Sequence, residues 1–254
     1  MKSYIKILII SLITVLSSFN VYGQEDENVE EVVVISSKIP VPLSEVVGSV
    51  TLITQDDLES RVVSDLGDVL ENTVGVSVPR NSQYGRYYNE GISIRGLGGS
   101  RVNIFVDGVR VSDAYAGYGR DVVEVDLLKR VEILKGPTSA LYGSDGLAGA
   151  VSYVTKDASD LTDSGLHFSG RYSHFSDSDQ TKYSVLAAFV GERVEGILQV
   201  TDKEGSEMSL HDDAVQEPNP VQSEGQSVLG KLMFDLNENI DVTLTLDNQE
   251  WSSD

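Results

Sequence analysis

The chain has 254 residues, with 40 Asp and Glu against 19 Lys and Arg, and a formal net charge of -21 at neutral pH. This acidic balance argues against a nucleic-acid-binding role, because phosphate backbones require a basic protein face. The absence of cysteine excludes a disulfide scaffold and thiolate metal sites.

The first 23 residues are typical of a secretory signal peptide. Lys2 and Lys6 precede an apolar run at 7–16. Segment 21–23 ends in a small residue and is typical of a cleavage site. The run is shorter than the roughly 20 residues of a transmembrane helix, and no stop-transfer sequence follows it, which disfavours an uncleaved anchor. We therefore expect an exported chain that begins near Gln24.

Residues 24–44 are expected to form an extended arm. The part before residue 32 is acidic and has no apolar period. A β-branched run at 32–35 follows, and Pro40 and Pro42 end it. A strand this short is not stable alone. It is either an edge strand of the next domain or a strand that pairs with a partner protein, where main-chain hydrogen bonds supply the affinity.

Residues 45–160 are predicted to form a small mixed α/β domain. Asp107-Gly108 is a strong two-residue hairpin signal. Helical segments are expected at 56–60 and 64–72, the second with Ser64 as its N-cap. The expected strands are 50–53, 75–78, 91–94, 102–106, 109–111, 131–134 and 150–155.

The glycine-rich loops of this domain do not match catalytic or nucleotide-binding motifs. The loop 96–101 ends in arginine where a dinucleotide fingerprint needs glycine, and it lies between two strands. Ser100 and Ser144 lack the flanking glycines of a nucleophile elbow. Glycines such as Gly146 and Gly149 are better explained by tight turns and close backbone approach. We therefore expect no enzymatic activity.

From residue 166 onward, apolar residues alternate with polar ones, which is the period of a half-buried strand. Each run is close to the ~9 to 11 residues that cross a membrane as a tilted strand. The runs begin at Leu166 and continue at 183–189, 194–200, 228–236 and 240–247.

The connections between these runs alternate in length. Segments 191–193 and 237–239 are short turns, whereas 176–180 and 204–224 are the expected loops on the other side. Outer-membrane barrels show this asymmetry, with short turns in the periplasm and long loops outside. Five strands do not close a barrel, because about eight are needed. We expect the N-terminal part of a longer protein, inactive as a transporter by itself.

Three stretches carry a resemblance to a known family: Ile94-Arg95-Gly96, Val106-Asp107-Gly108-Val109, and RVEILKGPTSALYGSDGLAGAVSYVTKD at 130–157. With the arm sequence EEVVVISSKIP at 30–40, they resemble TonB-dependent outer-membrane receptors. The resemblance implies an α+β plug domain followed by the first antiparallel strands of a transmembrane β-barrel, roughly 22-stranded when complete. It implies the Gram-negative outer membrane as location, with the arm in the periplasm. The implied domains are a signal peptide at 1–23, the arm at 24–44, the plug at 45–160 and the partial barrel at 161–254.

The resemblance also implies roles for particular residues. Glu31, Val32, Val33, Val34 and Ile35 correspond to the TonB box, the segment that pairs with TonB.

Arg95 and Lys135 correspond to two positions at which the family uses arginines to hold the plug against barrel glutamates. Lysine keeps the charge but loses the bidentate fork, so this latch is expected to be weaker.

Segments 141–146 and 153–157 are most similar to heme and hemoglobin receptors, and ferric siderophore receptors are the close alternative. Tyrosinate ligates ferric heme, so tyrosines of the apical loops are candidate substrate contacts, unless they are only amphipathic loop residues. His174 and His211 are candidate ligands near extracellular ends, whereas His167 is expected to line the lumen. The candidate tyrosines are Tyr84, Tyr87, Tyr88, Tyr115 and Tyr118.

The expected activity is TonB-dependent import of an iron-bearing nutrient, with heme or a ferric chelate as transported ligand and no intrinsic cofactor or metal. The expected partners are TonB, heme, hemoprotein or ferric siderophore, and outer-membrane lipid. A passive porin or adhesin-like barrel is the alternative from another class, although it would need neither plug nor arm.

Overall fold

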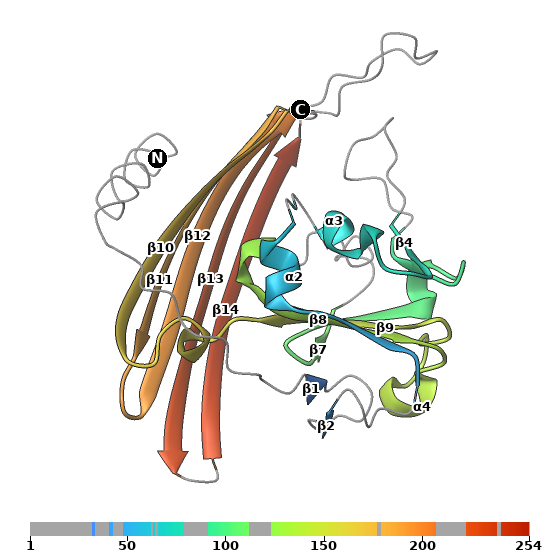
Figure 1. Ribbon diagram of the computed structural model, residues 1–254, viewed down its shortest axis with the longest axis horizontal. Helices are drawn as coiled ribbons and strands as arrows, with labels where there is room; N and C mark the ends of the chain where they lie inside the picture. The colour runs from blue at the N-terminus through green and yellow to red at the C-terminus, as the bar shows by residue number, and fades with distance from the viewer. Residues whose placement is uncertain are drawn as a thin grey trace. The chain divides into compact units, whose positions relative to one another are not determined.

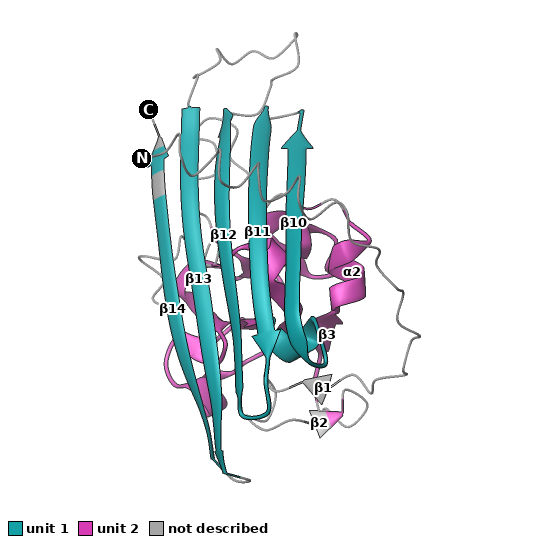
Figure 2. Ribbon diagram, turned by 90° about the vertical axis from the view of Figure 1, so that its left-hand side faces the viewer, with its two compact units in different colours: residues 1–23, 82–85, 156–254 teal, residues 24–81, 86–155 magenta. Residues whose placement is uncertain are grey.

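A computed structural model describes the chain in two compact units, one ending at residue 155 and one beginning at residue 156 (Figure 2). The first is mixed α/β, and the second consists of long strands and one short 3-10 turn. No helix within the described ranges is long and apolar enough to cross a membrane. The described residues are 32–33, 41–42, 48–61, 63, 66–78, 91–111, 123–176, 179–206, 222–237 and 240–253.

The first unit is built on a five-stranded sheet with the order β3-β8-β9-β6-β7. Strands β6 and β9 are parallel, and the other neighbours are antiparallel. The strands are β3 (Val50–Ile53), β6 (Val102–Val106), β7 (Val109–Arg110), β8 (Leu128–Lys135) and β9 (Gly149–Thr155).

Helices cover both faces of this sheet (Figure 1). On one side lie α2 (Gln55–Glu59) and α3 (Leu66–Glu71). On the other side α4 (Ser139–Tyr142) packs Tyr142 against Phe105 with ring centroids 4.6 Å apart. Ile133, Val151 and Tyr153 are fully buried in the sheet. The core is therefore a sheet shielded on both faces.

The shorter elements connect these layers. Thr54 caps α2 through a capping box with Asp57, and the backbone hydrogen bond from Thr54 lowers the pKa of Asp57.

The remaining elements are β1 (Val32–Val33), β2 (Val41–Pro42), β4 (Val76–Ser77), β5 (Ser93–Ile94) and the 3-10 turns Gly99–Arg101, Val125–Leu127 and Ala158–Asp160.

Most expected elements of this unit are confirmed, with three differences. Strand β8 begins at Leu128 and not at 131, because its first residues already pair with the end of β9. Helix α3 covers 66–71 within the expected 64–72, and Ser64 lies outside the described residues. Helix α4 was not expected, because its flanking glycines indicate a plain turn.

The β6–β7 hairpin is anchored by the side chain of its own turn. Asp107 and Gly108 have φ of 47° and 79°, the left-handed pair that a two-residue hairpin needs. The Asp107 carboxylate accepts hydrogen bonds from the Thr155 backbone N–H at 2.8 Å and the Thr155 hydroxyl at 2.7 Å. The turn is thereby tied to the end of β9.

The second unit is a meander in which each strand pairs antiparallel with the next (Figure 2). Strands β12 and β13 continue their pairing to Ser206 and Gln222, so the expected loop 204–224 is wrong at both ends. The strands are β10 (Gly165–Phe175), β11 (Gln180–Val190), β12 (Val194–Ser206), β13 (Gln222–Asn237) and β14 (Ile240–Ser253).

Replacing Asp107 with asparagine should loosen the junction between the hairpin and β9. The amide keeps the turn conformation but loses one charge-assisted acceptor, which we expect to cost about 1 to 2 kcal/mol. Hydrogen exchange of the β9 amides in the intact protein should then be roughly 5- to 30-fold faster. Glu71→Gln, at an exposed position, is the control. Unchanged protection of β9 in Asp107→Asn would contradict the anchor.

Candidate functional site

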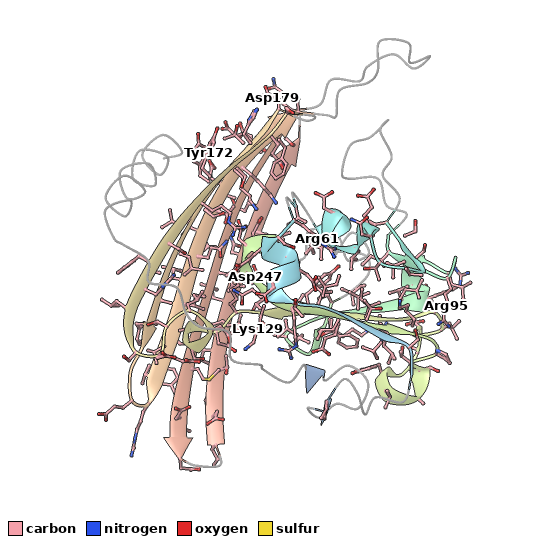
Figure 3. All side chains as sticks on the ribbon, viewed as in Figure 1. Arg61, Arg95, Lys129, Tyr172, Asp179 and Asp247 are labelled. Atoms are coloured by element: carbon pink, nitrogen blue, oxygen red, sulfur yellow. The ribbon has the colours of Figure 1, made fainter. Side chains whose placement is uncertain are left out.

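Arg95 occupies a tight turn of the first unit. Ile94 and Leu97 exchange both backbone hydrogen bonds, at 2.9 and 3.1 Å, across Arg95 and Gly96. The two turn residues have φ of 52° and 80°, and Arg95 is exposed (Figure 3). An arginine in the left-handed region is uncommon, so the turn presents this side chain at an energetic cost.

Lys135 lies beside this turn. Its Nζ donates to the carbonyl oxygen of Val74 at 2.9 Å, and the backbone N–H of Arg95 donates to the next carbonyl, of Gly75, at 2.7 Å. The two residues of the predicted latch are thus anchored on consecutive carbonyls. The barrel glutamates that the family resemblance implies for them stay a prediction.

The surroundings of Lys135 and the positive charge of Arg95 both affect the protonation of the Lys135 ammonium. Burial, and then the positive charge of Arg95, lower the pKa of the Lys135 ammonium from its ordinary value. Two cations side by side are stabilised by an anion, so the pair forms a surface suited to a carboxylate. This is the electrostatic feature of the unit that a latch requires.

The arm strip pairs with another part of the arm. Val32 lies opposite Pro42 and Val33 opposite Val41, in an antiparallel two-stranded sheet. The sequence predicted that this strip pairs with the next domain or with a partner protein. Pairing within the arm was not predicted, because each of the two strands has only two residues. The other predicted TonB-box residues, Glu31, Val34 and Ile35, lie outside the described residues.

The five long strands have one polar and one apolar face. On the polar face, Lys182, Gln199 and Thr201 are almost completely buried. His167 lies opposite Ala188 on this face, and its role in lining a lumen stays a prediction. The predicted alternation is confirmed along all five strands. The exposed side chains of the other face include Leu166, Phe168, Tyr172, Phe189, Leu198, Leu232, Leu244 and Leu246.

The height of the apolar face matches a bilayer. Tyr172 and Tyr183 pack against each other near one end, with ring centroids 5.2 Å apart and ring planes tilted by 50°, level with Gln226 of β13. From Gln226 to Leu236, β13 runs about ten residues, or about 33 Å along the strand. A strand tilt of roughly 40° reduces this to about 25 Å, the apolar band of outer-membrane barrels.

His174 lies on the apolar face and not on the polar one. It pairs with Thr181, two positions beyond Tyr172, near the end of the strands where Asp179 lies (Figure 3). Its Nδ1 is 3.3 Å from the Thr181 hydroxyl, and its Nε2 is 4.0 Å from the Asp179 carboxylate. The proposed role of His174 as a ligand near an extracellular end stays a prediction.

The other candidate substrate residues are not described. The structure does not test them, so their roles stay predictions. No group of three or more His, Asp or Glu suited to a metal ion occurs in the described ranges. The candidates in question are Tyr84, Tyr87, Tyr88, Tyr115, Tyr118 and His211.

Sequence reasoning missed an ion pair at the base of the second unit. Lys231 donates to the Asp157 carboxylate at 3.1 Å, and the Lys231 side chain is 7% exposed. Next to it, the backbone N–H of Ser159 donates to Glu195 at 3.1 Å. The only sequence signal was a lysine in the middle of an otherwise apolar strand. These contacts fix the turn Ala158–Asp160 on β12 and β13.

Residues 42–150 match the family model of the TonB-dependent receptor plug domain. The vitamin B12 transporter BtuB of Vibrio vulnificus is 36% identical over 154 residues, which are 61% of this chain and 25% of that protein.

Two solved structures share the fold at low sequence identity. The siderophore receptor PirA of Acinetobacter baumannii has a TM-score of 0.63 at 20% identity, over 80% of this chain and 32% of that one. The ferripyoverdine receptor of the outer membrane of Pseudomonas aeruginosa has a TM-score of 0.64 at 19% identity, over 86% and 27%. The chain thus spans between a quarter and a third of the length of these proteins.

The fold, a plug domain followed by antiparallel strands of a partial barrel, matches that of TonB-dependent receptor structures. The matched proteins are transporters and receptors and not enzymes, in agreement with the sequence prediction. None of the three proteins named above is described as a heme receptor.

Removing the charge of Arg95 should raise the pKa of Lys135 in the intact protein. The pKa is measured from the pH-dependent NMR shift of 13C-dimethylated lysine. Arg110→Gln, which removes a plug arginine paired with Asp145, is the control and should leave the Lys135 pKa unchanged. An unchanged Lys135 pKa in Arg95→Gln would contradict the pairing.

The sign of the stability effect follows from the direction of this shift. Between the lowered folded pKa and the ordinary value of 10.5, the unfolded chain binds more protons at Lys135. The contribution of Lys135 to plug stability therefore increases as pH rises through that window.

Proposed function

We propose that this chain acts in the TonB-dependent import of a metal chelate across the outer membrane of a Gram-negative bacterium. The observation that carries the proposal is the plug-domain match over residues 42–150. The strands that follow it support the membrane location, because their apolar face is as high as a bilayer.

Coupling to the energy source is assigned to residues 31–35. Strand addition to TonB needs mainly backbone groups, which fits a short β-branched strip. The β1–β2 pair shows that Val32 and Val33 adopt the extended conformation that such pairing requires. Ligand binding promotes import only if the ligand binds more tightly to the states in which this strip is released.

The transported ligand is proposed to be a metal-bearing tetrapyrrole, either heme or a corrinoid. The similarity of segments 141–146 and 153–157 to heme receptors favours heme, and the 36% identity to a vitamin B12 transporter adds the corrinoid. Ferric siderophores rank behind both, because structural likeness near 20% identity reflects the fold alone. Heme, hemoprotein and TonB thus remain the proposed partners.

Deleting residues 31–35 from the intact receptor should abolish import and leave ligand binding unchanged. The deletion removes the backbone groups that pair with TonB and leaves the plug sheet intact. Uptake of radiolabelled ligand by cells and binding to the purified receptor are measured in parallel. A deletion of equal length at 25–29, in the acidic part of the arm, is the control. Full uptake by the 31–35 deletion would refute coupled import through this segment.

The ligand class is distinguished by titrating the purified intact receptor with hemin, cyanocobalamin and a ferric siderophore. A tetrapyrrole should bind at least 10-fold more tightly than the siderophore, and hemin binding should shift the Soret band. The second measurement is growth of a receptor-deficient strain that carries the gene. Hemin or the ferric siderophore is given as the sole source of iron, or cyanocobalamin as the sole source of cobalamin. Tighter binding of the siderophore, together with growth on it alone, would overturn the tetrapyrrole assignment.

A further inference from the structure

The two paired strands of the arm, β1 and β2, have a backbone pattern that follows from their register. Val33 lies opposite Val41, and Val32 lies opposite Pro42. Opposite residues of an antiparallel pair alternate between those that exchange two backbone hydrogen bonds and those that exchange none. Pro42 has no N–H to exchange. Val33 and Val41 therefore form the hydrogen-bonded pair, and the backbone N–H and C=O of Val32 point away from β2.

The two outer edges of this pair differ in their capacity to bind another strand. In the described part of the chain the sheet consists of β1 and β2 alone. On the outer edge of β1, Val32 presents both a donor and an acceptor. On the outer edge of β2, Pro42 presents a carbonyl oxygen and no donor. Proline is one of the residues that keep an edge strand from pairing further. A third strand is therefore directed to β1.

A third strand on β1 would strengthen a sheet that is weak by itself. An isolated pair of strands is marginal in water, whereas a third strand gives the central one partners on both edges. Because β1 is already extended, a partner bears less of the entropic cost of ordering it. A partner on the outer edge also displaces none of the hydrogen bonds between Val33 and Val41. Pairing within the arm and pairing with a partner thus support each other.

We propose that a strand of TonB adds to the outer edge of β1, through Val32, while β2 stays paired on the inner edge. The complex then contains a three-stranded sheet in which β1 is the central strand. This inference rests on the proposed coupling through residues 31–35, and it adds a role for Val41 and Pro42, which lie outside that segment. In the opposite arrangement TonB would replace β2 on the same edge, and β2 would inhibit coupling.

A disulfide between positions 33 and 41 distinguishes these two arrangements. The Cα atoms of a hydrogen-bonded pair lie about 5.5 Å apart, within the range that a disulfide spans. The 254 residues contain no cysteine, so the variant with Val33→Cys and Val41→Cys introduces the only two thiols of this part of the protein. Peptide mass spectrometry verifies the bond. The variant with Val33→Ser and Val41→Ser is the control for the loss of the valine side chains.

Binding of purified soluble TonB to the ligand-loaded intact receptor is measured by biolayer interferometry before and after reduction. The crosslink holds β2 on β1 and leaves the outer edge of β1 open. The oxidised receptor should therefore bind TonB as tightly as its reduced form, or more tightly. Weaker binding on oxidation that is restored by reduction would overturn the proposal, because TonB would then need the edge that β2 occupies.

A proline at position 41 tests the contribution of β2 without a crosslink. Val41→Pro removes the N–H that Val41 donates to Val33. It should weaken TonB binding about two- to tenfold, the net effect of one backbone hydrogen bond. Val41→Ala keeps the N–H and is the control. Unchanged binding would exclude support from β2, and tighter binding would show that β2 competes with TonB; either result overturns the proposal.

A proline at position 32 tests the outer edge itself. Val32→Pro removes the donor on that edge and should weaken TonB binding about tenfold, because one hydrogen bond is lost and the proline ring obstructs the partner strand. Val32→Ala, which keeps the N–H, is the control. Equal affinity of Val32→Pro and Val32→Ala would exclude this edge as the binding surface.

Failure of this proposal is distinguishable from failure of the proposed function. Deletion of residues 31–35 tests coupled import without reference to β2. A receptor that loses import on that deletion, but binds TonB more weakly when positions 33 and 41 are crosslinked, keeps the proposed function and overturns the assigned edge alone. A wild-type receptor that binds no TonB overturns the coupling, and this inference with it.

Discussion

The alternation of side chains along the five long strands is the constraint on which the rest of this structure depends. A strand in lipid must pair all its backbone groups with neighbouring strands, and its side chains can differ only by face. A slip of one residue would move every apolar side chain to the polar face. The pairing from β10 to β14 is in register from end to end, with one shift between Asp235 and Asn237 beside the last short turn. The burial of Lys182 and the exposure of Leu198 follow from the same alternation.

The plug meets a different constraint, because a small domain without disulfides must hold its turns by other means. It does so with left-handed non-glycine residues whose neighbours hold them in place. Asp107 is fixed by Thr155, and Arg95 by the carbonyl of Gly75. Even the sheet contains a charge, since Glu132 is fully buried and paired with Arg130 at 2.8 Å. Such buried ion pairs add little net stability and leave the domain dependent on each partner.

Sequence reasoning succeeded where one local rule determines the structure. Strands 50–53 and 102–106 and the hairpin at Asp107-Gly108 follow from β-branched runs and turn chemistry. It failed at the ends of β12 and β13, because both faces are polar beyond the aromatic pair and alternation disappears while pairing continues. Residues such as Glu204 and Glu224 therefore resemble a loop although they form a ladder. Strict alternation from Leu166 predicts that His174 lies on the apolar face. The proximity of Arg95 and Lys135 is not predictable from such a local rule, because the two residues come together only in the folded domain.

The weakness of the β1–β2 pair limits what can control the proposed coupling to TonB. It comprises two residue pairs, and Pro42 has no N–H to donate. At a net 0.5 to 1.5 kcal/mol for each hydrogen bond, this pair alone holds the strip by only about 1 to 3 kcal/mol. A partner strand that pairs with all of 31–35 forms more hydrogen bonds than it displaces. Ligand-dependent control therefore cannot depend on this pair alone. It requires contacts in the plug that differ between the ligand-bound and ligand-free states.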